Sequence, residues 1–120
     1  MIKERRNYPK ASLEGEALLA IAESIHKAQL MGIAPAGVQV ECERQVVETL
    51  AQKKSEAGLY PDFDLIFNLP TDDTTISAHC TVSNCRRLSQ DRYHLVLGFE
   101  QICHDDDVKV NQFLGLLTSH

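Results

Sequence analysis

Hydrophobic and polar residues alternate with a period of two along much of the chain, which is the pattern of β-strands that bury one face. The most regular run is Ile76–Ser83, in which apolar residues alternate with Ser, His and Thr. The segments Phe63–Leu69 and Tyr93–Phe99 follow the same pattern, the first with a single exception. A turn at Ser89–Asp91 precedes the last run, so the sequence predicts an antiparallel hairpin over residues 74–100.

Three further strands are predicted upstream, and a glycine-containing loop interrupts them. Weaker alternation marks residues 12–22 and 25–31 as strands, and Val38–Cys42 forms a third. The segment Gly32–Gly37 contains Pro35, which cannot donate a hydrogen bond to a neighbouring strand, and glycines that tolerate positive φ angles. This segment is therefore predicted to be a loop.

Two segments have the spacing of amphipathic helices. Residues 43–57 contain no glycine or proline, and Gly58 follows as a natural terminus. The second helix is predicted over residues 106–117, because Asp105–Asp107 can accept hydrogen bonds from the free N–H groups of a first turn. Apolar residues lie on one stripe in both segments: Val46, Val47, Leu50 and Ala51 in the first, and Val110, Phe113, Leu114 and Leu117 in the second. The apolar stripe of the second helix is therefore expected to pack against a hydrophobic surface elsewhere in the fold.

Length and composition fit one small soluble domain. The chain has 120 residues, of which 43% are hydrophobic and 24% charged, and this suffices for a single modest core. Short alternating strands followed by a helix favour an all-β fold, a six-stranded antiparallel β-barrel closed by the C-terminal helix, over a parallel α/β sheet. Its predicted parts are a flexible basic arm at residues 1–11, a barrel at 12–104 with a helix inserted at 43–57, and the C-terminal helix at 105–120.

Positive charge is concentrated at the start of an otherwise acidic chain. The net charge is −5, yet Lys3, Arg5, Arg6 and Lys10 all lie within the first ten residues. This concentration favours a local contact with an anion, whereas binding of DNA or RNA normally requires a broad basic face. A solvated terminus that only maintains solubility is the alternative interpretation.

The sequence predicts neither export nor membrane insertion. No apolar run approaches the ~18 residues of a membrane span, and Met1 does not begin an apolar leader. The expected location is the cytoplasm, where structural disulfides are disfavoured. The four cysteines expected to be reduced thiols are Cys42, Cys80, Cys85 and Cys103.

Patterns for catalysis or metal binding are sparse. His79 and Cys80 are neighbours on a predicted strand and therefore point to opposite faces, which disfavours a shared metal ion, and no CxxC spacing is present. A P-loop and a GxSxG motif are also missing from the sequence. We therefore expect no catalytic residues, no metal and no cofactor. A small enzyme acting on a nucleotide or acyl substrate is the remote alternative.

Several segments together resemble the PilZ domain of bacterial cyclic di-GMP signalling. They are the arm Glu4–Lys10, the segment Gly32–Gly37, the strand Val38–Val40 and the segment Phe63–Pro70. The resemblance covers nearly the whole chain, and residues 43–57 are its main insertion. It implies a six-stranded antiparallel barrel closed by a helix, with a cyclic di-GMP site formed by an RxxxR arm and a [D/N]xSxxG loop.

Both ligand motifs depart from the family pattern. In the arm, which begins at Arg6, the second arginine is replaced by Lys10, and an ammonium lacks the two parallel N–H donors of a guanidinium. In the loop, Gly32 stands in place of Asp or Asn, Ala34 stands in place of Ser, and only Gly37 matches. Each lost hydrogen bond costs roughly 1–3 kcal/mol. The resemblance therefore implies weak nucleotide binding.

Two functions compete on these grounds. The first is a non-enzymatic signalling or adaptor protein that binds cyclic di-GMP weakly or not at all and acts through an unidentified protein partner. The second is a genuine cyclic di-GMP receptor that uses Arg5, Arg6, Lys10 and the Gly32–Gly37 loop, in which Arg5 next to the arm motif compensates in part. The candidate ligand-binding residues are Arg5, Arg6, Lys10, Gly32, Ala34 and Gly37.

Overall fold

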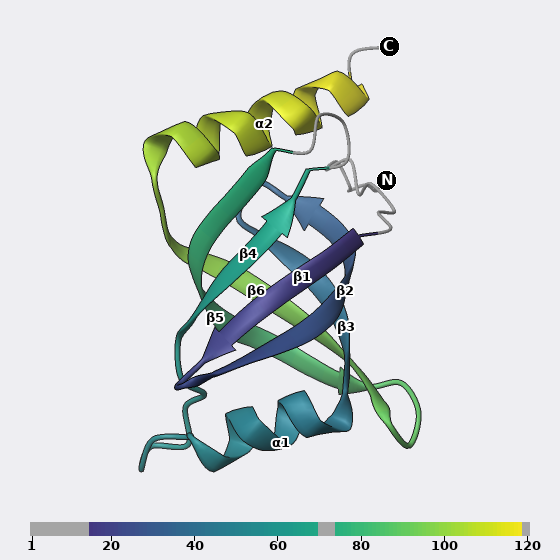
Figure 1. Cartoon of the computed structure of the whole chain (residues 1–120), viewed down its shortest axis with the longest axis vertical. Helices are drawn as coiled ribbons and strands as arrows, with labels where there is room; N and C mark the ends of the chain where they lie inside the picture. Colours follow the sequence, from purple (N-terminus) through teal and green to yellow (C-terminus); the bar gives the residue numbers. More distant parts are fainter. Residues whose placement is uncertain (1–14, 70–73, 119–120) are drawn as a thin grey trace, which may run out of the picture.

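Six antiparallel strands close into a β-barrel, and one helix lies at each end of it (Figure 1). The computed structural model describes residues 15–69 and 74–118. The strands follow one another around the barrel in the order β1-β2-β3-β6-β5-β4. The elements are β1 (Gly15–Ile21), β2 (Ser24–Ala34), β3 (Gly37–Glu43), α1 (Arg44–Gln52), β4 (Phe63–Asn68), β5 (Thr75–Arg87), β6 (Arg92–Ile102) and α2 (His104–Thr118). The predicted six-stranded barrel with a C-terminal helix is confirmed.

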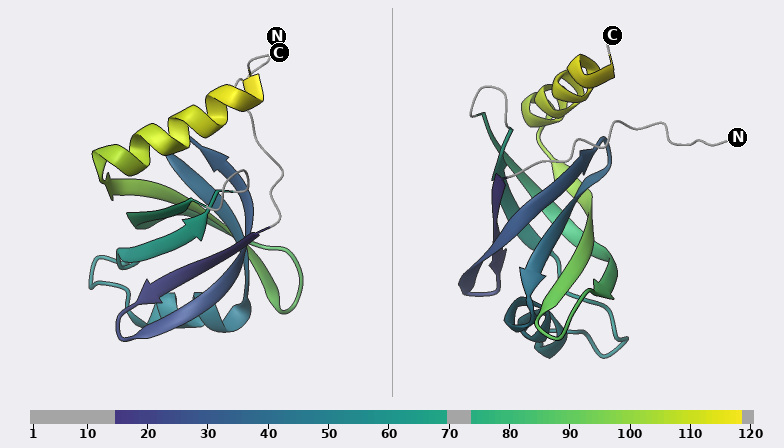
Figure 2. Two further views of the ribbon diagram at one scale, coloured as in Figure 1. Left: turned by 45° about the horizontal axis from the view of Figure 1, so that its top comes forward. Right: turned by 90° about the vertical axis from the view of Figure 1, so that its right-hand side faces the viewer.

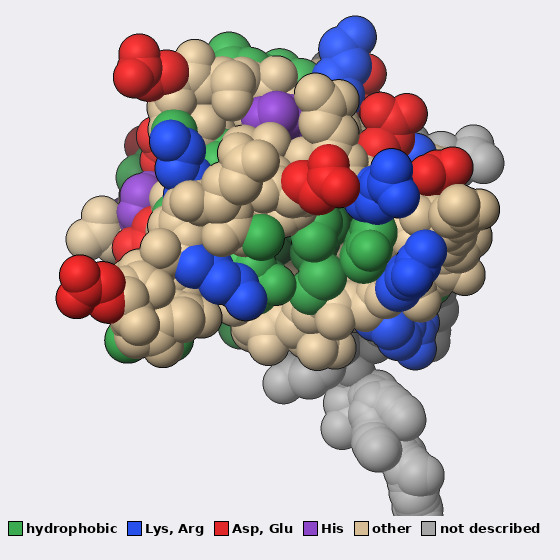
Figure 3. All heavy atoms as spheres, turned by 90° about the horizontal axis from the view of Figure 1, so that it is seen from below, with side chains coloured by type: hydrophobic (Ala, Val, Ile, Leu, Met, Phe, Trp, Pro, Cys, Tyr) green, Lys and Arg blue, Asp and Glu red, His purple; other side chains and the backbone are tan. Residues whose placement is uncertain are grey.

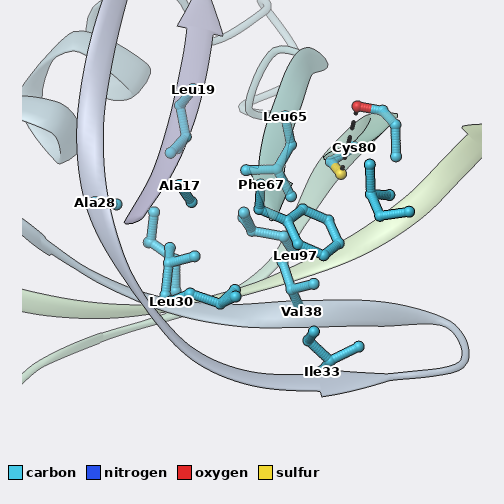
Figure 4. Close-up of a cluster of buried hydrophobic side chains, with 14 of the residues drawn as sticks. Ala17, Leu19, Ala28, Leu30, Ile33, Val38, Leu65, Phe67, Cys80 and Leu97 are labelled. Carbon is cyan, nitrogen blue, oxygen red and sulfur yellow. Dashed lines mark hydrogen bonds between the residues drawn. The ribbon is translucent and has the colours of Figure 1, made fainter. Parts of the chain in front are cut away.

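The period-two pattern sends alternate side chains into the barrel. In β4, Phe63, Leu65 and Phe67 are buried and the residues between them are exposed. Burial of each such side chain contributes roughly 1.5–3 kcal/mol to stability. Figure 4 shows side chains from several strands meeting inside the barrel, among them Ala17, Leu19, Leu30, Val38, Leu65, Phe67 and Leu97.

Pairing between β1 and β4 closes the sheet on itself. Ala17 lies opposite Phe67, and Leu19 lies opposite Leu65, while β1 pairs with β2 on its other side. Each strand therefore has two hydrogen-bonded neighbours. In the described part of the chain, no strand of the barrel has a free edge that could pair with another molecule.

Helix α2 lies across one end of the barrel and covers it (Figures 1 and 2). Val110, Phe113 and Leu114 are buried there as predicted, and the side chain of Leu117 lies outside the described part. The helix begins at His104, so the three aspartates lie inside its first turn and not ahead of it. Asp106 accepts a hydrogen bond from the backbone N–H of Ser77 at 3.1 Å, which ties the helix to β5.

Helix α1 lies at the opposite end and is shorter than predicted, because it ends at Gln52 and not at Ala57. Val46 and Leu50 are buried, but Ala51 is exposed, so the buried stripe is narrower than expected. Residues 51–59 are all exposed, and a further turn would bury no apolar surface to stabilise it.

The loop after α1 has backbone hydrogen bonds within itself, including one from the Ser55 N–H to the Leu59 carbonyl. Figure 3 views this end of the molecule and shows hydrophobic side chains flanked by Lys and Arg.

The segment Gly32–Gly37 is not a loop, which corrects the prediction from the sequence. Strand β2 runs through Ala34 and β3 begins at Gly37, so only Pro35 and Ala36 form the turn. Ile33 pairs with Val38 across the hairpin, and both are buried. Pairing and burial of these residues therefore override the local signals of glycine and proline.

Other strand boundaries also differ from those predicted: β5 continues past Ser83 to Arg87, and β6 continues past Phe99 to Ile102. Strand β2 begins at Ser24, and β1 ends at Ile21 because Ala22 has a positive φ of 55°. Residues 12–14 of the predicted first strand lie outside the described part of the chain. In that part, no helix is both long and apolar enough to cross a bilayer.

Candidate ligand-binding site

A pocket of about 320 Å³ lies beside the β2–β3 turn, between residues of β2 and β3 and residues of β5 and β6. Gly32, Ala34 and Gly37 all line it, so the structure brings together the three loop residues singled out in the sequence. The arm residues Arg5, Arg6 and Lys10 lie outside the described residues. Among the described residues, the lining consists of Gly32, Ile33, Ala34, Ala36, Gly37, Val38, Gln39, Ser83, Val96, Leu97 and Gly98.

Two β-bulges flank this pocket. In the β2–β3 pair, Leu30 lies opposite Val40 and Gly32 opposite Gln39, so Met31 is an additional residue. In the β5–β6 pair, the register shifts between Val82 and Asn84, so Ser83 is additional. A bulge bends its strand and increases the local twist. The pocket therefore lies where the regular surface of the barrel is interrupted on two strands.

Gly37 brings β3 close to β6 at the edge of the pocket. A Cβ atom on Gly37 would overlap the Leu97 carbonyl oxygen and lie 3.1 Å from the Cα of Gly98. The Phe99 N–H also donates to the Ala36 carbonyl at 2.8 Å, which holds the turn against β6. The glycine is thus required for strand packing, whatever the pocket binds.

The polar side chains in the pocket lining are Gln39 and Ser83, and each already has a partner. Gln39 Oε1 is 2.9 Å from His94 Nε2, and the Ser83 hydroxyl donates to the Val96 carbonyl at 3.0 Å. The described lining contains no Lys, Arg, Asp or Glu. The pocket can therefore pack against an apolar face of a ligand, but its side chains provide no charge to balance an anion.

The cysteine thiols are poor nucleophiles where they are buried. Burial raises the pKa of Cys42 to about 11 and that of Cys80 to about 12. Burial likewise raises the pKa of Cys85, whereas Cys103 is exposed. The buried thiols of Cys42 and Cys80 therefore stay protonated at neutral pH, and the thiolate is the reactive form.

His79 points outward, on the face opposite Cys80, as the sequence predicts. The hydrogen bond that His79 donates to the Asp64 carboxylate raises the pKa of His79, and the nearby carboxylates of Asp62 and Glu100 add to this effect. A hydrogen bond with Asp62 also raises the pKa of Glu100. The surroundings of His79 therefore stabilise a positive charge at this position.

Sequence reasoning missed several pocket residues, namely Gln39, Ser83, Val96 and Gly98. They come from β3, β5 and β6, and they meet because β6 pairs both with β5 and with β3, which is far from it in the sequence. Period-two alternation identifies outward-facing residues but not their neighbours across strands. The bulge at Ser83 has no signal in the local pattern, because alternation through Ile76–Ser83 is unbroken.

Comparison with known proteins supports the fold. No protein-family model and no curated protein matches the sequence. The inhibitor of motility MotI/DgrA from Bacillus subtilis is similar in structure, with a TM-score of 0.67 and 17% identity over 98% of this chain and 55% of that one. The PlzA protein of Borreliella burgdorferi, solved in complex with cyclic di-GMP, has a TM-score of 0.56 and 14% identity over 91% of this chain and 49% of that one.

Both neighbours are PilZ proteins, and this chain spans about half the length of each. The match to MotI/DgrA covers 98% of this chain and so includes the closed antiparallel barrel and both helices. The protein therefore has the PilZ-like β-barrel fold.

Proposed function

We propose that the protein is a non-enzymatic PilZ-type signalling or adaptor protein of the cyclic di-GMP network, with weak or absent nucleotide binding and action through protein contacts. The observation that carries this proposal is the chemistry of the pocket beside the β2–β3 turn. Gly32 and Ala34 line it where the PilZ pattern has Asp or Asn and Ser. Neither residue has a side-chain hydrogen-bonding atom.

The expected loss of affinity is large. Two missing hydrogen bonds cost about 2–6 kcal/mol together, which is roughly 30-fold to 10⁴-fold in the dissociation constant. Gln39 and Ser83 do not compensate, because both are engaged with other parts of the barrel. A contact with the nucleotide would then depend on charge from Arg5, Arg6 and Lys10.

The alternative is a genuine cyclic di-GMP receptor, and the pocket itself favours it. The lining is mostly apolar, and its partly exposed residues Ala34 and Val96 can pack against a flat base. The PlzA neighbour was solved in complex with cyclic di-GMP. In this alternative, the basic arm binds the phosphates and the pocket binds the base.

Calorimetric titration of the full chain with cyclic di-GMP distinguishes the two functions. We expect weak, salt-sensitive binding or none, because charge from the arm is screened at physiological ionic strength. Sub-micromolar affinity at ~150 mM salt would establish the receptor and reject the adaptor. Turnover of a nucleotide panel is measured in parallel, and we expect every nucleotide to remain intact.

A further inference from the structure

An outward-facing cluster on β4, β5, β6 and the residue just before β4 places a histidine ring among three carboxylates. His79 of β5 lies opposite Asp64 of β4, and its Nδ1 is 2.9 Å from Asp64 Oδ1. The other ring nitrogen, Nε2, is 3.6 Å from Asp62 Oδ2 and 3.7 Å from Glu100 Oε1. One ligand atom from each of Asp62, His79 and Glu100 lies within 4.8 Å of the others.

A third β-bulge places Glu100 in this cluster. His79 lies opposite Gln101, and Cys80 lies opposite Phe99, so Glu100 is an additional residue in the β5–β6 pair. Glu100 and Gln101 are consequently both exposed, whereas strict alternation would direct one of them inward. Bulges commonly re-aim side chains beside functional sites. Here the bulge places a carboxylate oxygen of Glu100 beside the His79 imidazole.

The distances around Nε2 fit a bound metal ion. Both carboxylate oxygens are farther away than the ~3.2 Å limit of a good N–H···O hydrogen bond. Bonds of about 2.0–2.2 Å from a tetrahedral Zn²⁺ to nitrogen and oxygen place the two donor atoms about 3.4 Å apart. The observed separations of 3.6 and 3.7 Å are close to this value. A cation between the three groups would also balance the negative charge of the Asp62 and Glu100 carboxylates when both are ionised.

Asp64 is placed to orient the ring. When its Oδ1 accepts the Nδ1–H proton, the lone pair on His79 Nε2 points toward Asp62 and Glu100. Histidines that bind metals almost always donate their second N–H to a carboxylate, a carbonyl or water, which fixes the tautomer. Asp64 would thus be a positioning residue and not a ligand.

We propose that Asp62, His79 and Glu100 bind a divalent transition-metal ion, with Zn²⁺ as the first candidate and water completing its coordination. An imidazole ligand suits Zn²⁺, whereas Mg²⁺ and Ca²⁺ prefer sites built from oxygen alone. None of these three residues lines the pocket beside the β2–β3 turn. The site is therefore independent of the proposed function. It departs from the sequence-based expectation of no metal, which considered His79 only with its neighbour Cys80.

Zinc titration of the full chain tests this site. The protein is freed of metal with a chelator, kept reduced, and titrated with ZnCl₂ by calorimetry. All variants carry Cys103→Ser and His104→Gln, because these two exposed neighbours could bind zinc themselves. We expect one saturable site of micromolar affinity. His79→Gln and Glu100→Gln are each expected to weaken binding at least tenfold, about 1.4 kcal/mol, and Asp64→Asn about tenfold through loss of ring orientation.

The matched control is His26→Gln, since His26 is also a partly exposed strand histidine with a side-chain hydrogen bond. It should leave the zinc affinity unchanged. A circular dichroism spectrum of each variant confirms that the barrel is intact. The proposal is overturned if micromolar Zn²⁺ gives no saturable binding, or if the His79 and Glu100 variants bind as well as the parent. MgCl₂ should produce no comparable heat, and equal binding of Mg²⁺ would reject a transition-metal site.

Discussion

Gly37 in β3 lies directly opposite Gly98 in β6, and the strands are so close there that no side chain fits at position 37. A Cβ atom would overlap the Leu97 carbonyl oxygen, and backbone atoms cannot move aside without disturbing the β3–β6 pairing. Gly98 is less restricted, because a Cβ there would lie 3.9 Å from Thr81 Oγ1. The match of Gly37 to the PilZ motif thus has a structural reason that requires no ligand.

Gly37→Ala should therefore destabilise the barrel. Overpacking typically costs about 1–3 kcal/mol, and this should lower the urea midpoint without abolishing cooperativity. The matched control is Gly98→Ala, which introduces the same methyl group on the facing strand where space is available. Equal midpoints for the two variants would contradict the proposed steric asymmetry.

Helix α2 should be necessary for a stable fold. Replacing Phe113 and Leu114 by Asp places two carboxylates where both side chains are almost fully buried, and burial of unpaired charge is strongly unfavourable. We expect the variant to unfold or aggregate, as measured by thermal melting and light scattering. Asn111→Asp with Gln112→Asp adds the same charge at exposed positions of the same helix. If both double variants melted at the parent temperature, the packing role of α2 would be wrong.

The cysteines should differ in reactivity according to their burial. Cys103 is exposed and should react with iodoacetamide in the folded protein. Cys42 and Cys80, whose pKa values are raised to about 11 and 12 by burial, should react only after denaturant is added. Raising the pH from 7 to 9 should not change this order, because both buried thiols remain protonated below their pKa. Mass spectrometry of labelled peptides measures the sites, and early labelling of Cys80 would contradict the closed barrel.

The sequence predicted the strands well because burial inside a small barrel leaves a direct mark on the local pattern. Phe63, Leu65 and Phe67 alternate with polar residues for that reason. The sequence-based prediction was wrong where a local loop signal opposed strand pairing. Gly32 was predicted to lie in a loop, but it belongs to β2 because it pairs with Gln39 of β3. The prediction also extended α1 too far, since helical propensity continues past Gln52 but contact with the barrel does not.

The two candidate sites differ in how far they could be predicted. Gly32, Ala34 and Gly37 are close in sequence, so a local motif was sufficient to group them. The cluster around His79 could have been found from the strand predictions, because a short connection between β4 and β5 sets Asp64 opposite His79. The place of Glu100 in this cluster could not have been predicted, since it depends on a bulge that the alternation does not indicate.

The last prediction concerns the nucleotide and restores the PilZ motif in this chain. The variant Lys10→Arg with Gly32→Asp and Ala34→Ser returns a guanidinium, a carboxylate and a hydroxyl to the positions where the family pattern has them. If the pocket is otherwise intact, affinity for cyclic di-GMP should increase at least tenfold, about 1.4 kcal/mol, as measured by calorimetry at fixed salt.

The control for this variant is Gln52→Asp with Lys53→Arg and Ala57→Ser, which makes the same change in charge at exposed positions. These positions do not line the pocket, so the control should bind no better than the parent. An increase confined to the pocket variant would show that the missing side-chain atoms limit binding. No increase would mean that the apolar lining around Ala34 and Val96 does not fit the base. Action through a protein partner would then be the function that remains of the two.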